Sequence, residues 1–275
     1  MDLIELIPGR REKRRTCRRV SSGGRMMAWA VSLSIAAVLF GGCRSTAEPP
    51  ESTPPSQTKA QAQTQPAQTP QTPSVEKPEP KPAWPPEPGR QVSLFDGKTL
   101  GQWKPTDFGG QGEVHIKDGA IYMDMGSYMT GITWAGPVVR MSYEITLEAM
   151  RVQGSDFFCG LTFPVGEKPC TLVLGGWGGS LCGLSSIDHF DASENETTRM
   201  INFENGKWYH VRLRVVPNRI QAWLDDEALV DIDVTGRAID VRMEVEASQP
   251  LGIATWNTGG AARNIQLQKL PDEVQ

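Results

Sequence analysis

From residue 92 onward the chain alternates apolar and polar side chains with a period of two, and this pattern predicts strands. The clearest case is a hairpin of residues 208–216 and 219–225 around Pro217 and Asn218. Its apolar face holds Val211, Leu213, Val215, Ile220, Ala222 and Leu224, and its polar face holds His210, Arg212, Arg214, Gln221, Trp223 and Asp225. Residues 141–148 alternate in the same way. Strands with one apolar face predict an all-β sandwich of two sheets packed on those faces.

The stretch before this domain has a different composition. Residues 44–91 contain 13 of the chain's 21 prolines and no Leu, Ile, Phe or Met. A segment of this kind cannot bury a core and is extended by its prolines. We therefore expect residues 44–91 to be a disordered linker rich in Pro, Gln and Thr, and residues 92–271 to be the single folded domain.

Residues 1–43 have the organisation of an export signal. A basic segment precedes a mostly apolar run at 28–40, which is short for a membrane span. Residues 39–43 read LFGGC, similar to a bacterial lipoprotein cleavage box, so Cys43 is the expected lipidated residue. We expect an exported cell-envelope lipoprotein, periplasmic or on the outer-membrane surface, bound to the membrane through this anchor. A plain transmembrane anchor is the alternative, and translation could begin at Met1, Met26 or Met27.

Charge and cysteine content narrow the partners and the chemistry. Residues 1–43 carry eight Lys and Arg against three Asp and Glu, which leaves 20 basic and 29 acidic side chains in the remainder. Such an acidic balance argues against nucleic acid as a partner. The domain has three cysteines, Cys159, Cys170 and Cys182, without a CxxC spacing. We interpret them as small buried apolar residues.

Several segments of the domain carry a family resemblance. They are VSLFDGKTLGQW at 92–103, VHIKDGAIYM at 114–123, SYEITLE at 142–148, NGKWYHVRLRV at 205–215 and LGIATWNTGGAARNIQLQKL at 251–270. Together they resemble the 3-keto-disaccharide hydrolase domain family. The resemblance implies a concanavalin A-like, laminin G-like jelly roll of two antiparallel sheets. It also implies a carbohydrate partner and hydrolysis of 3-keto-glycosides, in which the ketone acidifies a neighbouring C–H so that a base can expel the glycosidic oxygen.

The least strand-like stretch, residues 175–199, is the predicted location of the chemistry. Its acceptors and imidazole suit acid–base catalysis or an oxygen-rich cation site. For proton transfer we name Asp188, His189 and Glu196, with Glu148 as a further carboxylate. For substrate contacts we name Asp191, Glu194 and Asn195. The equally weighted alternative is a solvated acidic loop held by Asx-turns. No ligand spacing defines a metal, although the oxygen-rich loop leaves room for a divalent cation.

Aromatic side chains supply candidate platforms for sugar rings. Trp177 is the first choice because the glycines around it predict a projecting turn, and Asp156 is expected at the same rim. Trp134, Trp223 and Trp256 are further candidates, with Trp223 expected opposite Arg212.

The motifs and candidate residues leave three classes of function. A classical retaining glycosidase is disfavoured, because no Glu-x-Asp-x-x-Glu motif occurs. The acid pairs Glu144 with Glu148 and Glu244 with Glu246 are expected on solvated strand faces. The remaining classes are a glycan hydrolase, a non-catalytic glycan-binding module and a laminin G-like adhesion domain. The resemblance favours the hydrolase.

Overall fold

The computed structural model of the protein describes residues 84–271. The predictions for residues 1–43, including the lipidation of Cys43, and for the linker as far as residue 83 lie outside the described residues. Residues 84–91, assigned above to the linker, contact the domain. Trp84 packs against the hydrophobic core, and the backbone N–H of Gly89 donates to the carbonyl of Lys269 at 2.8 Å.

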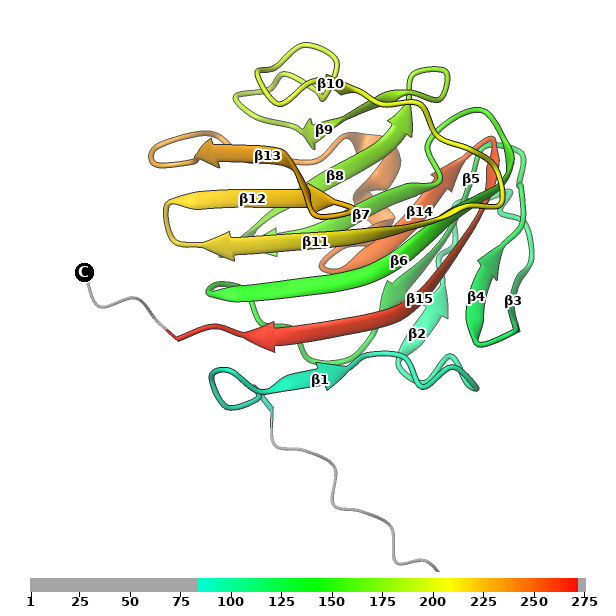
Figure 1. The fold of residues 1–275 in the computed structure, drawn as a ribbon, viewed down its shortest axis with the longest axis horizontal. Coiled ribbons are helices and arrows are strands. Elements are labelled where there is room, and N and C mark those ends of the chain that lie inside the picture. The colour runs from blue at the N-terminus through cyan, green and yellow to red at the C-terminus, as the bar shows by residue number, and fades with distance from the viewer. Residues whose placement is uncertain (1–83, 272–275) are drawn as a thin grey trace, which may run out of the picture. The chain divides into compact units, whose positions relative to one another are not determined.

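The domain is built from two antiparallel sheets packed face to face, with almost no helix (Figure 1). The eight-stranded sheet has the order β13-β12-β11-β6-β15-β4-β3, with β1 also pairing with β15. Its strands are β1 (Gln91–Ser93), β3 (Val114–Lys117), β4 (Ala120–Met123), β6 (Tyr143–Gly154), β11 (Trp208–Val216), β12 (Arg219–Leu224), β13 (Glu227–Asp233) and β15 (Thr258–Lys269).

The seven-stranded sheet has the order β10-β9-β8-β7-β14-β5-β2. Its strands are β2 (Trp103–Pro105), β5 (Met129–Trp134), β7 (Cys159–Val165), β8 (Lys168–Gly176), β9 (Leu181–Ser185), β10 (Arg199–Met200) and β14 (Gly252–Trp256). Strands that neighbour each other in space come from distant parts of the chain, as in β6 beside β15 and β7 beside β14. The fold is thus the predicted all-β, concanavalin A-like jelly roll.

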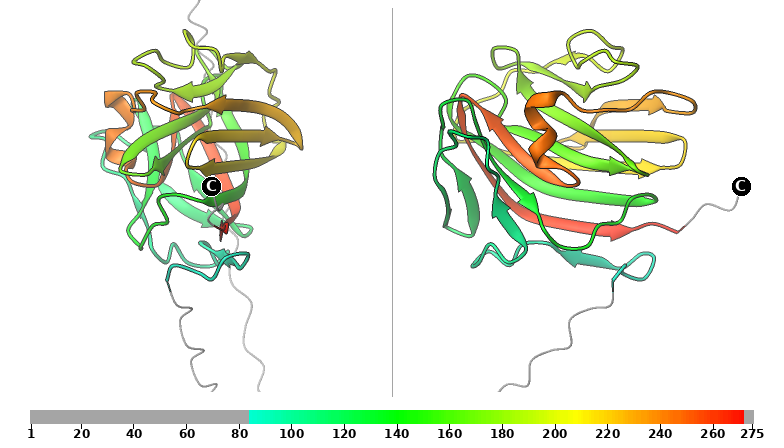
Figure 2. Two further views of the ribbon diagram at one scale, coloured as in Figure 1. Left: turned by 90° about the vertical axis from the view of Figure 1, so that its left-hand side faces the viewer. Right: turned by 180° about the vertical axis from the view of Figure 1, so that it is seen from behind.

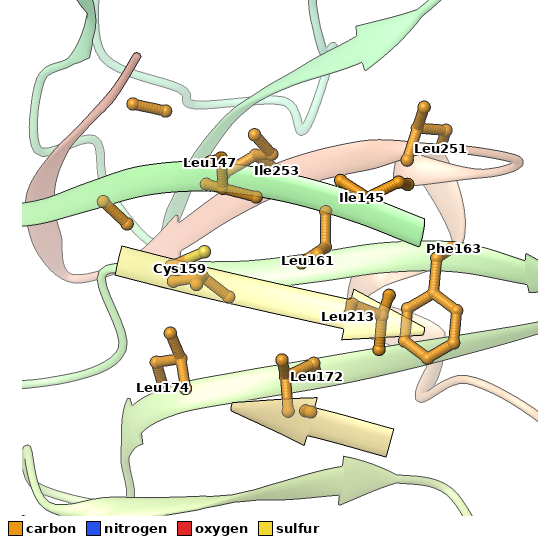
Figure 3. Packing of buried hydrophobic residues seen from close by; sticks show 14 of the residues in the cluster. Ile145, Leu147, Cys159, Leu161, Phe163, Leu172, Leu174, Leu213, Leu251 and Ile253 are labelled. Atoms are coloured by element: carbon orange, nitrogen blue, oxygen red, sulfur yellow. The ribbon is translucent and has the colours of Figure 1, made fainter. Parts of the chain in front are cut away.

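The core lies between the sheets and is formed by every second residue of the central strands. Figure 3 shows Ile145 and Leu147 of β6 close to Leu161 of β7 and Ile253 of β14. All four are at most 1% exposed, which fits the alternation read from the sequence. Burial of these apolar faces holds the two sheets together.

The strand registers confirm the predicted hairpin. In β11 and β12, Arg212 lies opposite Trp223, and in β7 and β8, Cys159 lies opposite Leu174. Cys182 of β9 also lies opposite Leu174. A bulge between Leu174 and Gly176 adds an unpaired residue to β8 next to this pair.

The three cysteines of the domain are buried and free, as predicted. Burial raises the pKa of the Cys159 and Cys170 thiols to about 12. It raises the pKa of the Cys182 thiol to about 11. All three therefore stay protonated at neutral pH and behave as small apolar side chains.

A segment that includes the 3-10 helix η1 (Met243–Ser248) lies across the outer face of the seven-stranded sheet, where Figure 2 shows it in orange. Gly252 of β14 allows this close approach, since a Cβ there would lie 2.5 Å from the carbonyl oxygen of Ser248. Glu244 and Glu246 belong to this helix, so their expected placement on a strand face is wrong. Within the described residues, no helix is long and apolar enough to cross a membrane.

Candidate functional site

An open pocket of about 190 Å³ lies on the outer face of the seven-stranded sheet. Its floor is formed by Thr171 and Val173 of β8 and Ser185 of β9, which alternate with core residues such as Leu172. The other lining residues are Asp156, Phe157, Trp177, Arg242, Glu244, Val245 and Trp256. The walls therefore come from three separate places: the loop before β7, the turn after β8, and the η1 segment with the end of β14.

Trp177 forms a projecting wall of this pocket. It occupies the turn between β8 and β9 with a φ of 48°, and 45% of its surface is exposed. The turn ends at Gly179, which packs closely against the loop before β7. A Cβ at this position would lie 2.7 Å from the carbonyl oxygen of Ser155. The turn predicted from the glycines around Trp177 thus presents the indole ring to solvent at the rim of a concave site.

A buried arginine holds the turn in place. Arg151 of β6 is 7% exposed, and its guanidinium donates to the carbonyl of Gly179 at 3.1 Å. The same group donates to Asn205 Oδ1 at 2.7 Å and to the carbonyl of Phe203 at 2.5 Å. Because three acceptors share one planar guanidinium, the position of the Trp177 turn is coupled to the sheet behind it.

Two more aromatic rings line the pocket. Trp256 at the end of β14 lies 6.5 Å from Phe157 between ring centroids, and its backbone N–H donates to the carbonyl of Phe157 at 3.0 Å. Both rings are only partly buried and pack on the small cluster of Met129, Val245 and Ala254. The pocket thus offers flat apolar surfaces of the kind on which the C–H faces of a sugar ring stack.

Asp156 is a polar group at the rim, as the sequence suggested. Its Oδ1 accepts from the backbone N–H of Phe157 at 2.7 Å, and its Oδ2 accepts from that of Gly178 at 3.2 Å. The backbone N–H of Asp156 donates to Thr258 Oγ1 at 2.9 Å. The carboxylate is therefore aimed by backbone donors, and in the described residues it forms no ion pair.

The opposite wall carries an arginine between two carboxylates. Arg242 contacts Glu244 with Nη2 to Oε1 at 2.8 Å, and Asp191 with Nη1 to Oδ2 at 2.5 Å. Arg242 lowers the pKa of Glu244. Burial alone would raise the pKa of Asp191, but hydrogen bonds from Ser193 and the charge of Arg242 outweigh burial and lower it. Both carboxylates are ionised at neutral pH.

The acidic loop of residues 188–196 does not converge on this pocket. Asp188 Oδ2 accepts from Arg237 Nε at 2.6 Å and Glu196 Oε1 from Arg237 Nη1 at 2.8 Å, which ties the loop to the segment after β13. His189 and Glu194 are exposed. None of these four lines the pocket, and Asp191 reaches it only through Arg242.

Asn195 has a scaffolding place within the same loop. Its Nδ2 donates to the carbonyls of Leu184, Phe190 and Asp191, and its Oδ1 accepts from the backbone and hydroxyl of Thr197. No free polar atom of its side chain is left for a ligand. The described residues contain no group of three or more His, Cys, Asp or Glu that could hold a metal ion.

Glu148 and Trp223 lie on the outer face of the other sheet. Glu148 is paired with Arg263 at 2.6 Å and accepts from Asn264 Nδ2 at 2.8 Å. The Trp223 ring is covered by the guanidinium of Arg212, 3.7 Å from its centroid. Neither residue is near the pocket. Trp134 is 7% exposed and packs edge-on against Trp103, so it belongs to the core.

Sequence reasoning missed several lining residues. Thr171 and Ser185 gave no signal, because they read as polar positions of ordinary strands. Arg242 and Glu244 come from a segment that crosses the sheet face more than 50 residues after Trp177. Phe157, next to Asp156, was visible in the sequence only as part of an aromatic pair.

Solved structures with a similar fold include proteins connected with carbohydrate. A candidate glycosyl hydrolase of Parabacteroides distasonis is 18% identical, with 66% of this chain and 94% of that chain covered and a TM-score of 0.42. The carbohydrate-binding module CBM66 of Bacillus subtilis is 10% identical, with 61% and 95% covered and a TM-score of 0.39. A Bacillus subtilis protein with a galectin-like fold is 9% identical, with 66% and 94% covered and a TM-score of 0.44.

The sequence itself matches one family model. The model of the 3-keto-alpha-glucoside-1,2-lyase-like domain matches residues 90–268, which is nearly the whole described domain. Among curated proteins, no sequence matches this chain significantly.

Proposed function

Since the chain belongs to the family of 3-keto-alpha-glucoside-1,2-lyase-like domains, we propose that its pocket binds a 3-keto-glycoside and cleaves it by elimination. Family membership identifies a carbohydrate-active domain. The observation that carries the finer proposal is that Asp156 is the only lining carboxylate without an arginine partner in the described residues. It is therefore free to act as a base, whereas Glu244 is committed to Arg242.

The proposed reaction needs one base and one group that stabilises negative charge. Asp156 takes the proton from C2, next to the ketone at C3, and that electron pair forms a double bond between C1 and C2. The bond between C1 and the glycosidic oxygen breaks, and the leaving oxygen takes the proton back from Asp156. The products are a conjugated enone and an alcohol, and no water is consumed.

Arg242 is the group in the lining best suited to stabilise the developing enolate oxygen. Its guanidinium is already fixed by Glu244 and Asp191, so little reorganisation is needed when charge develops. Trp177, Trp256 and Phe157 would orient the ring by stacking on its apolar faces.

Turnover of 3-keto-trehalose by the purified protein tests this proposal. Elimination releases glucose together with an ultraviolet-absorbing enone, whereas direct hydrolysis releases glucose without the chromophore. Asp156→Asn should lower kcat at least 100-fold, the usual scale for loss of a general base. Asp226→Asn, at an exposed turn position with a φ of 68°, is the matched control and should keep full activity. Unchanged turnover in Asp156→Asn would contradict the proposal.

A non-catalytic glycan-binding module is the second candidate. The feature that favours it is the aromatic character of an open pocket in which, within the described part of the chain, only one carboxylate is unpaired. Retention on polysaccharide without turnover of any 3-keto-glycoside would support binding over catalysis.

We also propose that the protein is an exported cell-envelope lipoprotein anchored at Cys43, on the sequence features of residues 1–43 alone. Cell fractionation and mass spectrometry of the mature N-terminus test this proposal. Cys43→Ser should release the protein from the membrane fraction, and a membrane-bound, unlipidated product would support a transmembrane anchor instead.

A further inference from the structure

The aromatic wall of the pocket continues beyond it onto a neighbouring loop. The ring of Tyr128, which follows β4 and immediately precedes β5, lies 5.7 Å from Trp256 between centroids. Trp256 in turn lies 6.5 Å from Phe157 inside the pocket. We call the three rings of Phe157, Trp256 and Tyr128 the aromatic ledge. Its inner two rings line the pocket, and Tyr128 does not.

Tyr128 is exposed although its loop is fixed. The side chain is 66% exposed, while its carbonyl accepts from the backbone N–H of Asn257 at 2.7 Å. The preceding Ser127 donates its backbone N–H to the carbonyl of Gly110 at 2.8 Å. Gly126 packs so closely on this second loop that a Cβ would lie 2.7 Å from the same carbonyl oxygen. A large ring is thus held out into solvent on a well-anchored backbone.

We propose that Tyr128 and Trp256 form a second sugar subsite, which stacks the neighbouring ring of a glycan whose first ring occupies the pocket. The proposal rests on the proposed function for the first ring. The occupant is argued from continuity, because Trp256 belongs to both the pocket and the outer part of the ledge. An uncharged sugar fits, since the ledge is formed by three uncharged aromatic side chains.

Binding of unreactive sugars isolates this subsite from catalysis. Trehalose supplies two rings and methyl α-glucoside supplies one, and neither carries the ketone required for elimination. Their affinities for the purified protein can be measured by titration calorimetry. The wild-type protein should bind trehalose more tightly, and Tyr128→Ala should weaken trehalose binding about tenfold while changing methyl α-glucoside binding less than twofold. Tyr128→Phe keeps the ring and should retain the affinity.

Phe190→Ala is the matched control, because Phe190 is 55% exposed but lies on the acidic loop outside the ledge. It should leave both affinities unchanged. If Tyr128→Ala does not fold, Tyr128→Leu removes the flat ring while keeping apolar volume, and the same result is expected.

Three results would overturn the second subsite: equal wild-type affinity for the two sugars, absence of binding by both, or the same weakening of both in the Tyr128 variants. The proposed elimination is judged separately by turnover of 3-keto-trehalose. If the wild-type protein does not turn over 3-keto-trehalose but binds trehalose in a way that depends on Tyr128, the lyase is rejected and the second subsite is supported.

Discussion

The two outer faces of the sandwich carry similar kinds of side chain in opposite arrangements. On the eight-stranded sheet the aromatic rings are covered by arginines: Arg212 lies 3.7 Å from the Trp223 centroid and Arg263 lies 4.1 Å from that of Trp208. On the seven-stranded sheet, Trp177 is 45% exposed and borders a hollow. Both faces carry tryptophan, and they differ in whether an arginine covers the ring.

The two faces also differ in the groups that hold their carboxylates. Glu144 contacts Arg212 and Arg214, and Glu148 contacts Arg263, so the acids of the eight-stranded face are neutralised within the sheet. On the pocket side Glu244 is paired with Arg242, but Asp156 is held by backbone N–H groups instead. Backbone donors orient a carboxylate without occupying it with a counter-charge, which leaves it available to a ligand. This contrast explains why one face is a candidate site, whereas on the other face the charged and aromatic side chains are paired with one another.

The largest effect is expected at Arg151, which links the eight-stranded sheet to the Trp177 turn. Arg151→Met would leave the buried carbonyls of Gly179 and Phe203 without this donor, at a cost of about 3 kcal/mol in unfolding free energy. Urea unfolding measures this loss. Glycan affinity, measured where the variant is still folded, should also fall because the turn is no longer held. Normal affinity in a folded variant would show that other contacts position Trp177.

A direct comparison of the two faces comes from removing one tryptophan from each. Trp177→Ala should weaken glycan binding about tenfold or more with little loss of stability, because nearly half of the side chain is exposed. Trp223→Ala should leave binding unchanged and cost about 1 kcal/mol through the lost contact with Arg212. Titration calorimetry and thermal unfolding measure the two quantities. Reversed results would place the binding surface on the eight-stranded sheet.

The sequence was sufficient for most of the fold because strand alternation and turn residues are local signals. It predicted the hairpin of β11 and β12 with Arg212 opposite Trp223, and it placed Trp177 on an exposed turn. The bulge at Gly175 was not predicted. A bulge depends on how the neighbouring strands pair, which alternation within one strand does not report.

The candidate site was predicted only in part, because its charged groups are brought together by tertiary structure. The acidic loop looked reactive as a sequence, but Arg237 neutralises Asp188 and Glu196 from 49 and 41 positions away. Arg242 reaches the pocket because the segment containing η1 folds over the sheet. Arg237 stands far from both of its partners in the chain and Arg242 stands 51 positions from Asp191, so no local pattern identifies these pairs.

Low pH should lower the stability of the folded protein through the arginine–carboxylate pairs on both faces. Only the pair on the pocket side should also affect ligand binding. Arg242 lowers the pKa of Glu244 in the folded protein below its ordinary value of 4.5. A lowered folded pKa contributes stability above the unfolded pKa, and that contribution is lost as pH falls below about 4.5 through the folded pKa. For Glu148, burial opposes the shift, but Asn264 and Arg263 still lower the pKa.

Arg242→Gln and Arg263→Gln separate these two contributions. Each variant should lose less unfolding free energy than the wild-type protein between pH 7 and about pH 3, since its carboxylate loses the arginine that helps to lower its pKa. Urea unfolding at a series of pH values measures the slopes. At pH 7, Arg242→Gln should also weaken glycan binding, whereas Arg263→Gln should not. Equal effects of the two variants on binding would remove Arg242 from the site.

The smallest effect is expected at two buried hydroxyl groups on the pocket side. Ser185 and Ser248 are at most 2% exposed, and their Oγ atoms have no hydrogen-bond partner among residues 84–271. Replacing an unpartnered hydroxyl by a hydrogen atom loses no hydrogen bond and removes a desolvated polar group. Ser185→Ala and Ser248→Ala should therefore each change stability by less than about 1 kcal/mol, toward greater stability.

Thr197→Val is the contrast, because Thr197 Oγ1 accepts from the backbone N–H of Leu184 at 2.8 Å and donates to Asn195 at 2.6 Å. Thermal unfolding should show a clear loss for Thr197→Val alone. A comparable loss in Ser185→Ala would mean that the floor of the pocket depends on a hydrogen bond from this hydroxyl, and the floor would then be a polar network instead of a passive surface beneath the aromatic walls.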